Sequence, residues 1–210
     1  MNPSEYYKSM KKLAANVRKE HKLTTSRVLP SDLKIILKAE GVSEIVLFPG
    51  FKNLRGMYYF EGKLPIVAVK KDLPRDPYAF TLGHELKHHL VDQHLLSKDF
   101  DSMVCTTKNQ EEMIEIGAEV FSAELLYPEE LFLHDIFAQG VGSSGCKPED
   151  LVYLKKATDT TLSYSGLAKR ATLLRLVTPG SLDNIPWKKL EEEIFGEPIY
   201  KQWANRKKAR

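Results

Sequence analysis

Two kinds of hydrophobic pattern alternate along the chain. Apolar residues recur at spacings of three and four, which is typical of helices with one buried face, over residues 3–20, 30–41, 77–91, 109–127, 148–158, 163–177 and 186–195. Short β-branched or aromatic runs bounded by turn-forming residues predict strands at residues 45–48, 57–60 and 66–69. This order of elements predicts an α+β fold, in which a small antiparallel sheet packs on helices and a helical extension follows at the C-terminal end.

Capping residues mark several of the predicted helix ends. Asn2, with Glu5 three residues later, forms a capping box at the start of the first helix. Asp76 followed by Pro77 predicts that another helix begins at residue 77. Gly41 is placed to end the second helix in a left-handed conformation.

The charge is unevenly distributed along the sequence. The 210 residues carry 31 Lys and Arg against 28 Asp and Glu, a formal net charge of +3. Five basic and no acidic residues lie in positions 201–210, so the preceding 200 residues sum to −2. A nearly neutral body gives no electrostatic reason to expect nucleic acid in its cleft. The 42% of hydrophobic residues excludes a wholly disordered chain.

No stretch of the sequence has the pattern of a secretory signal or of a membrane span. We therefore expect a cytoplasmic protein with no membrane partner. Cys105 and Cys146 are too few for a disulfide framework, and we expect them to be free thiols.

The segment 140–145, rich in Gly and Ser, is the best candidate for a linker. Residues 1–140 before it form the predicted core with its N-terminal helices. Residues 146–180 are predicted to be a small helical segment packed on this core. Residues 181–210 are predicted to form a C-terminal helix and a basic tail.

The helix predicted at 77–91 contains the sequence HELKH at residues 84–88. His84 and His88 are four residues apart and share a helix face, so both imidazoles can reach one zinc ion at about 2.0–2.1 Å. Glu85 is turned about 100° from His84 around the helix. It is therefore placed as a general base for a water molecule on the metal rather than as a ligand in the same plane.

A third metal ligand is predicted on the next helix along the chain. Zinc in a hydrolase usually takes three protein ligands and leaves one position for water. Glu115 and Glu119 lie one turn apart on the same face of that helix. One carboxylate can bind the metal while the other orients a ligand imidazole through a hydrogen bond.

The residues around these motifs resemble the ImmA/IrrE family of gluzincin-like metallo-endopeptidases. The stretch FTLGHELKHHL at 80–90 resembles the family's HELGH helix, and EIGAEVFSAELLYP at 115–128 resembles its second helix, of pattern ExxANxFAxxLLMP. Similar features lie at GFKNLRG (50–56), Pro65-Ile66, Arg75 and residues 163–177. The resemblance covers about residues 30–178.

This resemblance implies the roles of the candidate residues. His84, His88 and Glu115 are implied as metal ligands and Glu85 as the catalytic general base, while Glu119 would orient a ligand histidine. The implied cofactor is Zn²⁺, with Mn²⁺ or another divalent metal as alternatives.

Three residues depart from the family pattern. Gly83 stands where Ala is frequent, Lys87 where Gly is frequent, and Glu119 where Asn or Asp is usual. We expect Lys87 to be a solvated lysine on the surface of the helix. The longer carboxylate of Glu119 can still accept a hydrogen bond from a ligand histidine, but its reach differs.

The implied function is that of a zinc-dependent endopeptidase, a hydrolase acting on peptide bonds, in which Glu85 deprotonates a metal-activated water. The resemblance further implies that the substrate is a helix-turn-helix transcriptional repressor, whose cleavage derepresses phage, other mobile-element or stress-response genes. The alternative is a regulatory DNA-binding or repressor-binding protein with a structural or vestigial metal site. A fourth ligand, such as His89 or a loop cysteine, would favour the alternative because structural zinc sites are closed.

Basic residues near the C-terminal end are the main argument for DNA binding. The helices at 148–158 and 163–177 carry several Lys and Arg residues and could form a helix-turn-helix. The apolar stripe on 163–177 instead favours packing, and the tail at 201–210 is most simply a solvated terminus. Direct DNA binding is therefore not expected, although the C-terminal segment leaves it open.

Two features of substrate handling remain undecided by sequence spacing alone. The residues chemically able to stabilise an oxyanion are His89, His94, Tyr127, His134 and Tyr153. The strand at 66–69 directly precedes the HExxH helix and could pair with an extended substrate at a sheet edge.

Overall fold

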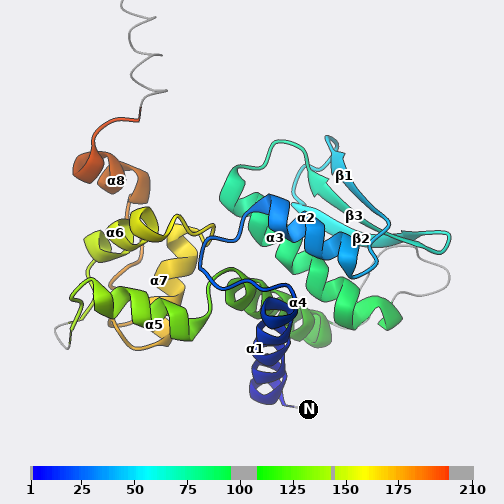
Figure 1. Ribbon diagram of the computed structural model, residues 1–210, viewed down its shortest axis with the longest axis horizontal. Coiled ribbons are helices and arrows are strands. Elements are labelled where there is room, and N and C mark those ends of the chain that lie inside the picture. Colours follow the sequence, from blue (N-terminus) through cyan, green and yellow to red (C-terminus); the bar gives the residue numbers. More distant parts are fainter. Residues whose placement is uncertain (1, 96–107, 143–144, 199–210) are drawn as a thin grey trace, which may run out of the picture. The chain divides into compact units, whose positions relative to one another are not determined.

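The structure is a computed structural model that describes residues 2–95, 108–142 and 145–198 (Figure 1). The chain divides into two compact units, Met1–Phe132 with Asp159–Ser163 and Leu133–Thr158 with Tyr164–Arg210. The division falls within helix α5 (Glu129–Ala138), ahead of the predicted linker at 140–145. The packing of 146–180 on the core stays a prediction.

The first unit combines helices with a three-stranded sheet, so the predicted α+β fold is confirmed. Its elements are α1 (Pro3–Glu20), α2 (Pro30–Ala39), β1 (Glu44–Phe48), β2 (Gly56–Glu61), β3 (Leu64–Lys70), α3 (Arg75–Lys87), a π-helix η1 (His88–Asp92), a 3-10 turn η2 (Gln93–Leu95), α4 (Lys108–Leu126) and the first residues of α5. The second unit contains the rest of α5, α6 (Pro148–Thr158), α7 (Tyr164–Leu173) and α8 (Trp187–Phe195). Helix α5 was not predicted.

The sheet is mixed rather than antiparallel, with strand order β1-β3-β2. β3 pairs antiparallel with β2 through a tight hairpin, but it pairs parallel with β1, where Glu44 lies opposite Ile66. The segment 49–55 is long enough to carry the chain past the place that β3 later takes. The antiparallel prediction is therefore wrong for the β1–β3 pair. Because β3 has a neighbour on each side, the prediction that residues 66–69 pair with substrate is also wrong.

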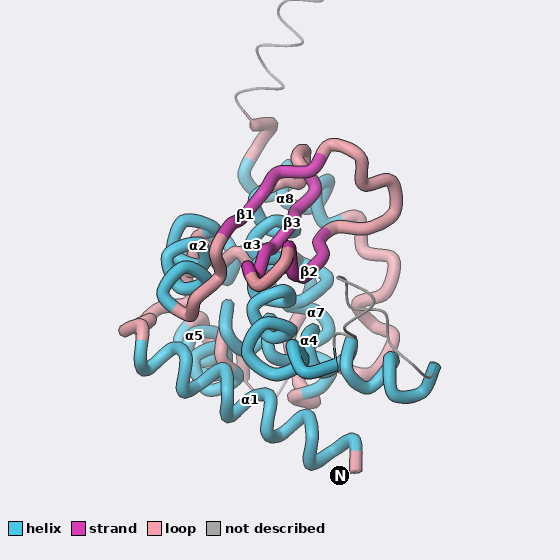
Figure 2. The backbone as a smooth tube through the Cα atoms, turned by 90° about the vertical axis from the view of Figure 1, so that its right-hand side faces the viewer, coloured by secondary structure: helices cyan, strands magenta, loops and turns pink. Residues whose placement is uncertain are grey.

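Helix α3 lies at the centre of the first unit. It contacts β2 and β3 on one side and α4 on another, while α2 packs on α3 and α1 packs on α4 (Figures 1 and 2). Leu82 and Leu86 of α3 are fully buried, as are Phe121 and Leu125 of α4. These residues carry the helical apolar spacing of the sequence, so the pattern that predicts the helices also forms the core.

Most helix ends follow their capping residues. The capping box of α1 is formed as predicted, with Glu5 N–H donating to Asn2 Oδ1 at 2.9 Å. Gly41 follows α2 with a left-handed φ of +103°. Asp76 is not a cap, because α3 begins at Arg75 and places Asp76 in its first turn, where an acidic side chain suits the helix dipole.

Two helices differ from the prediction near their C-terminal ends, one because it ends early and one because it leaves α-helical geometry. α7 ends at Leu173 instead of 177, because Arg175 adopts a left-handed φ of +57° and Leu176 N–H donates back to the carbonyl of Ala171 at 2.9 Å. The helix predicted at 77–91 leaves α-helical geometry after Lys87 and continues as the π-helix η1.

Among the residues that the structure describes, no helix has the length and apolarity required to cross a lipid bilayer. Cys146 is a buried free thiol, and burial raises its pKa to about 12, which makes it unreactive. Cys105 and the basic tail at 201–210 lie outside the described residues.

A buried arginine ties α1 to the end of α4. The Arg18 side chain is 6% exposed and donates to the carbonyls of Leu125 at 2.5 Å, Thr25 at 2.8 Å and Leu23 at 2.9 Å. A single guanidinium thus satisfies three main-chain acceptors from two parts of the chain.

Replacing Arg18 by Met keeps roughly the length of the side chain but leaves these three carbonyls, of which that of Leu125 is buried, without their donor. We expect Arg18→Met to lower the free energy of unfolding by about 3 kcal/mol, measured by urea denaturation. The neighbouring Lys19 is exposed, so Lys19→Met is the matched control and should change stability by less than about 0.5 kcal/mol. Equal midpoints for the two variants would contradict this role of Arg18.

Candidate metal centre

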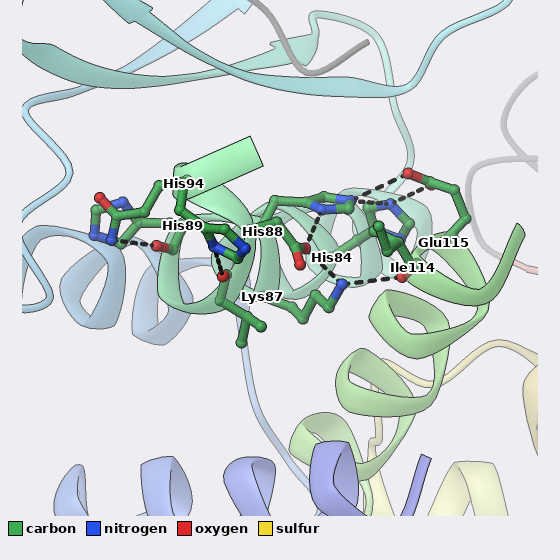
Figure 3. A network of polar contacts seen from close by, with 10 residues as sticks. His84, Lys87, His88, His89, His94, Ile114 and Glu115 are labelled. Carbon is green, nitrogen blue, oxygen red and sulfur yellow. Dashed lines mark hydrogen bonds and ion pairs between the residues drawn. The ribbon is translucent and has the colours of Figure 1, made fainter. Parts of the chain in front are cut away.

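Three side chains from neighbouring elements bring potential metal ligands together (Figure 3). His84 comes from α3, His88 from the start of η1, and Glu115 from α4. The Nε2 atoms of the two histidines are 3.0 Å apart. Glu115 Oε2 is 3.0 Å from His84 Nε2, and Glu115 Oε1 is 3.5 Å from His88 Nε2.

The spacing and chemistry of this group fit a zinc ion. Four ligands in tetrahedral geometry at 2.0–2.1 Å from zinc lie about 3.3 Å from one another. The observed separations of 3.0–3.5 Å are close to this value. Two imidazoles and one carboxylate are also the donor set of several hydrolytic zinc sites. The side chain of Glu115 is 51% exposed and that of His88 only 4%, so the group opens to solvent on the side of Glu115.

A carboxylate that the sequence reasoning missed orients His88. The Nδ1 atom of His88 is 2.8 Å from Asp92 Oδ2. Because an ionised carboxylate only accepts hydrogen bonds, Nδ1 of His88 donates to Asp92, and Nε2 is the nitrogen that faces His84 and Glu115. This is the arrangement that a metal ligand requires. The i, i+4 spacing of His88 and Asp92 was a signal available in the sequence.

Glu119 was the residue predicted to orient a ligand histidine. It is exposed on α4, one turn after Glu115. Its proposed role stays a prediction, while the carboxylate within hydrogen-bond distance of His88 Nδ1 is that of Asp92.

When no metal is bound, the contact between His84 and Glu115 favours the charged form of both side chains. Burial alone would lower the pKa of His84, but the hydrogen bond to Glu115 and the charges of Glu85 and Glu115 outweigh it and raise this pKa. The same hydrogen bond lowers the pKa of Glu115. A metal ion that binds these two ligands therefore competes with a proton for His84.

Glu85 lies beside this group in a buried position. Its side chain is 5% exposed, and burial raises its pKa against the opposing effect of His84, His88 and a hydrogen bond from the backbone of Tyr58. A Cβ atom at residue 56 would come within 2.5 Å of Glu85 Oε1, so only Gly56 lets the start of β2 pass this close.

The expectation that Lys87 is solvated is wrong. Its side chain is 0% exposed, and its Nζ lies 2.5 Å from Asp92 Oδ2 and 3.0 Å from the carbonyl oxygen of Ile114. The ammonium also lies 5.5 Å from the centre of the Tyr6 ring. The turn between the two histidines faces other parts of the core instead of solvent, which is why the surface interpretation fails.

Gly83, another departure from the family pattern, has a packing reason. A Cβ atom at this position would lie 2.6 Å from the Oγ of Ser122 on α4. Ser122 itself is fully buried and donates to the carbonyl of Phe80 at 2.8 Å. Glycine therefore allows α3 and α4 to approach closely just where each contributes a ligand.

His89 is directed away from the ligand group (Figure 3). Its Nε2 is 2.9 Å from the carbonyl of Glu40, which can only accept, so Nδ1 accepts from the hydroxyl of Tyr58 at 3.0 Å. Burial raises the pKa of Tyr58 to about 12 and keeps this hydroxyl protonated. His89 therefore does not supply the fourth ligand that a structural zinc site would need.

Two of the remaining oxyanion candidates have contacts within the first unit. A ring nitrogen of His94 is 2.9 Å from the carbonyl of Val91, and Tyr127 is fully buried against Phe132. His134 and Tyr153 belong to the second unit.

The sequence comparison agrees with this geometry. Residues 46–143 match the model of the IrrE N-terminal-like domain, Peptidase_M78, a family that is typically metal-dependent. No curated protein matches the chain. The matched segment includes β2, β3, α3 and α4, and with them the whole ligand group and Glu85. This match to a metallopeptidase-like domain supports an ImmA/IrrE family assignment for the chain.

Proposed function

We propose that the protein is a zinc-dependent endopeptidase in which His84, His88 and Glu115 hold the metal and Glu85 is the general base. The observation that carries this proposal is the group of three ligand atoms within 4.8 Å of one another, open to solvent, with a buried carboxylate beside it. The metal would supply Lewis acidity, which polarises a peptide carbonyl and acidifies water.

Glu85 would move the protons of the reaction. A base works best when its pKa lies close to the working pH, and burial shifts the pKa of Glu85 upward in that direction. Its carboxylate would accept a proton from the attacking water and return it to the leaving amine. The hydrogen bond from the Tyr58 backbone and the close passage of Gly56 hold the carboxylate in place.

An extended substrate segment would add to the sheet at β2. This strand is an edge strand, and it is the strand that contacts Glu85 through Gly56 and Tyr58. Pairing at a sheet edge supplies main-chain hydrogen bonds to a peptide without demanding particular side chains. The scissile segment of the substrate would therefore have to be extended and locally unfolded.

The proposed substrate is a helix-turn-helix repressor in the cytoplasm, whose cleavage would derepress phage, other mobile-element or stress-response genes. This proposal follows from the resemblance to the ImmA/IrrE family and from the match to its peptidase domain.

The alternative, a DNA-binding or repressor-binding protein with a structural or vestigial metal site, has less support. Both nitrogens of His89 are engaged elsewhere, and the half-exposed Glu115 leaves the group open. Arg170 is one of the basic residues on the second helix of the possible helix-turn-helix, predicted at 163–177, and it is only 6% exposed.

Glu85→Gln tests the general base. The amide has nearly the same shape but cannot accept a proton, so hydrolysis of a protein substrate should fall by about 10²–10⁴-fold while zinc binding measured by calorimetry is retained. The exposed Glu130 on α5 offers the matched control, Glu130→Gln, which should retain full activity. Normal cleavage by a zinc-loaded Glu85→Gln variant would remove the assignment.

If a gene adjacent to that of this protein encodes a helix-turn-helix repressor, the substrate proposal is tested with that repressor in purified form. We expect a limited cut in the presence of Zn²⁺, detected by mass spectrometry, and no cut after chelation or with Glu85→Gln. Duplex DNA titrated at two salt concentrations should show no salt-dependent binding. An intact repressor combined with steeply salt-dependent DNA binding would instead favour the alternative function.

A further inference from the structure

The turn between the two histidine ligands contains a buried cation that the proposed reaction does not use. Lys87 Nζ contacts Asp92 Oδ2 on η1 at 2.5 Å and the carbonyl of Ile114 on α4 at 3.0 Å (Figure 3). The Tyr6 ring of α1 lies under the same ammonium. One side chain of α3 thus touches three other elements of the first unit.

The π-helix explains how Asp92 can serve two partners at once. In a continuous α-helix, the residue five positions after Lys87 would be turned about 140° away from it. η1 instead closes its turn over five residues, and this brings Asp92 next to both residue 87 and residue 88. Its Oδ2 atom accepts from Lys87 Nζ at 2.5 Å and from His88 Nδ1 at 2.8 Å.

The ammonium offsets the cost of burying the carboxylate. The side chain of Asp92 is only 3% exposed, and an isolated buried carboxylate is strongly destabilising. Lys87 supplies the opposite charge and fixes the position of Oδ2, so the carboxylate can hold the ring of His88. A buried ion pair of this kind contributes orientation more than stability.

The second contact of Lys87 reaches the other side of the ligand group. Ile114, whose carbonyl accepts from Nζ, directly precedes Glu115 on α4. The ammonium therefore connects the backbone beside one ligand with the carboxylate that orients another.

We propose that Lys87 is a positioning residue of the metal centre, which holds Asp92 against His88 and the α4 backbone beside Glu115 so that the ligands are preorganised for metal. This inference rests on the metal binding in the proposed function. Lys87, which stands where glycine is frequent in the family, would thus have a defined role in the metal centre.

Zinc affinity is the first measurement. Lys87→Met retains most of the side-chain volume but removes the charge and both hydrogen bonds, and we expect it to weaken zinc binding by about 10–100-fold. The exposed Lys71→Met is the matched control and should bind as the wild type does. If Lys87 acts through Asp92, adding Lys87→Met to Asp92→Ala should weaken binding much less than Lys87→Met does alone.

A spectroscopic measurement on the metal-free protein separates positioning from a general loss of structure. Long-range ¹H–¹⁵N spectra of the imidazoles should show His88 as the Nδ1–H tautomer in the wild type, and as a mixture of tautomers in folded Lys87→Met. If Lys87→Met does not fold, Lys87→Gln retains a neutral donor and should give intermediate values in both measurements.

The two hypotheses fail in different ways. A wild-type protein that binds no zinc would overturn the proposed function, while the tautomer of His88 would still test the role of Lys87. Wild-type zinc affinity and an unchanged His88 spectrum in folded Lys87→Met would overturn the inference and leave the endopeptidase proposal standing.

Discussion

The close contact between α3 and α4 is the constraint on which the candidate site depends. The ligand atoms come from two helices, yet they must lie within about 3–4 Å of one another to share an ion. Glycine meets this requirement at Gly83, where any Cβ would reach Ser122 of α4. Gly117 does the same on the other side of α4, where a Cβ would lie 2.4 Å from the ring of Tyr6 on α1. Because glycine has no Cβ atom at these two positions, the helices can pack at a short separation. This separation in turn determines how far apart the ligand atoms lie.

Around this contact, the buried polar groups form a connected network rather than isolated pairs. Asp92 links Lys87 to His88, and Lys87 continues to the backbone of α4. His89, the next residue, joins β2 to the end of α2 through Tyr58 and Glu40. Neighbouring residues of one turn thus fix opposite sides of the helix. Networks of this kind are costly when incomplete, and for that reason they favour a single arrangement when every partner is present.

Local signals predicted most of the helices and the ligand group. The capping box at Asn2 and the HExxH spacing depend on residues close in sequence or on helical periodicity, whereas the choice of Glu115 over Glu119 rests on the resemblance to the ImmA/IrrE family. The parallel pairing of β1 with β3 depends on the path of a loop, which carries no periodic signal. The contact between Lys87 and Asp92 was missed because a 3.6-residue period was assumed throughout, whereas the helix widens after residue 87. The i, i+4 spacing of His88 and Asp92 was an available signal that was overlooked. Arg175 ended α7 in a left-handed conformation that the sequence gives no reason to assign to arginine.

Because the turn at η1 is widened, the backbone geometry between His88 and Asp92 contributes to the site. On the surface of a helix, side chains can normally be exchanged as long as the apolar stripe is kept. Here the geometry of the backbone also matters, because it decides which side chains Asp92 can contact. With the same number of residues in ordinary α-helical geometry, the carboxylate would lie about 140° around the helix from Lys87, even with every named side chain retained. The backbone geometry of residues 88–92, and not only the identity of their side chains, therefore decides whether one carboxylate can contact both Lys87 and His88.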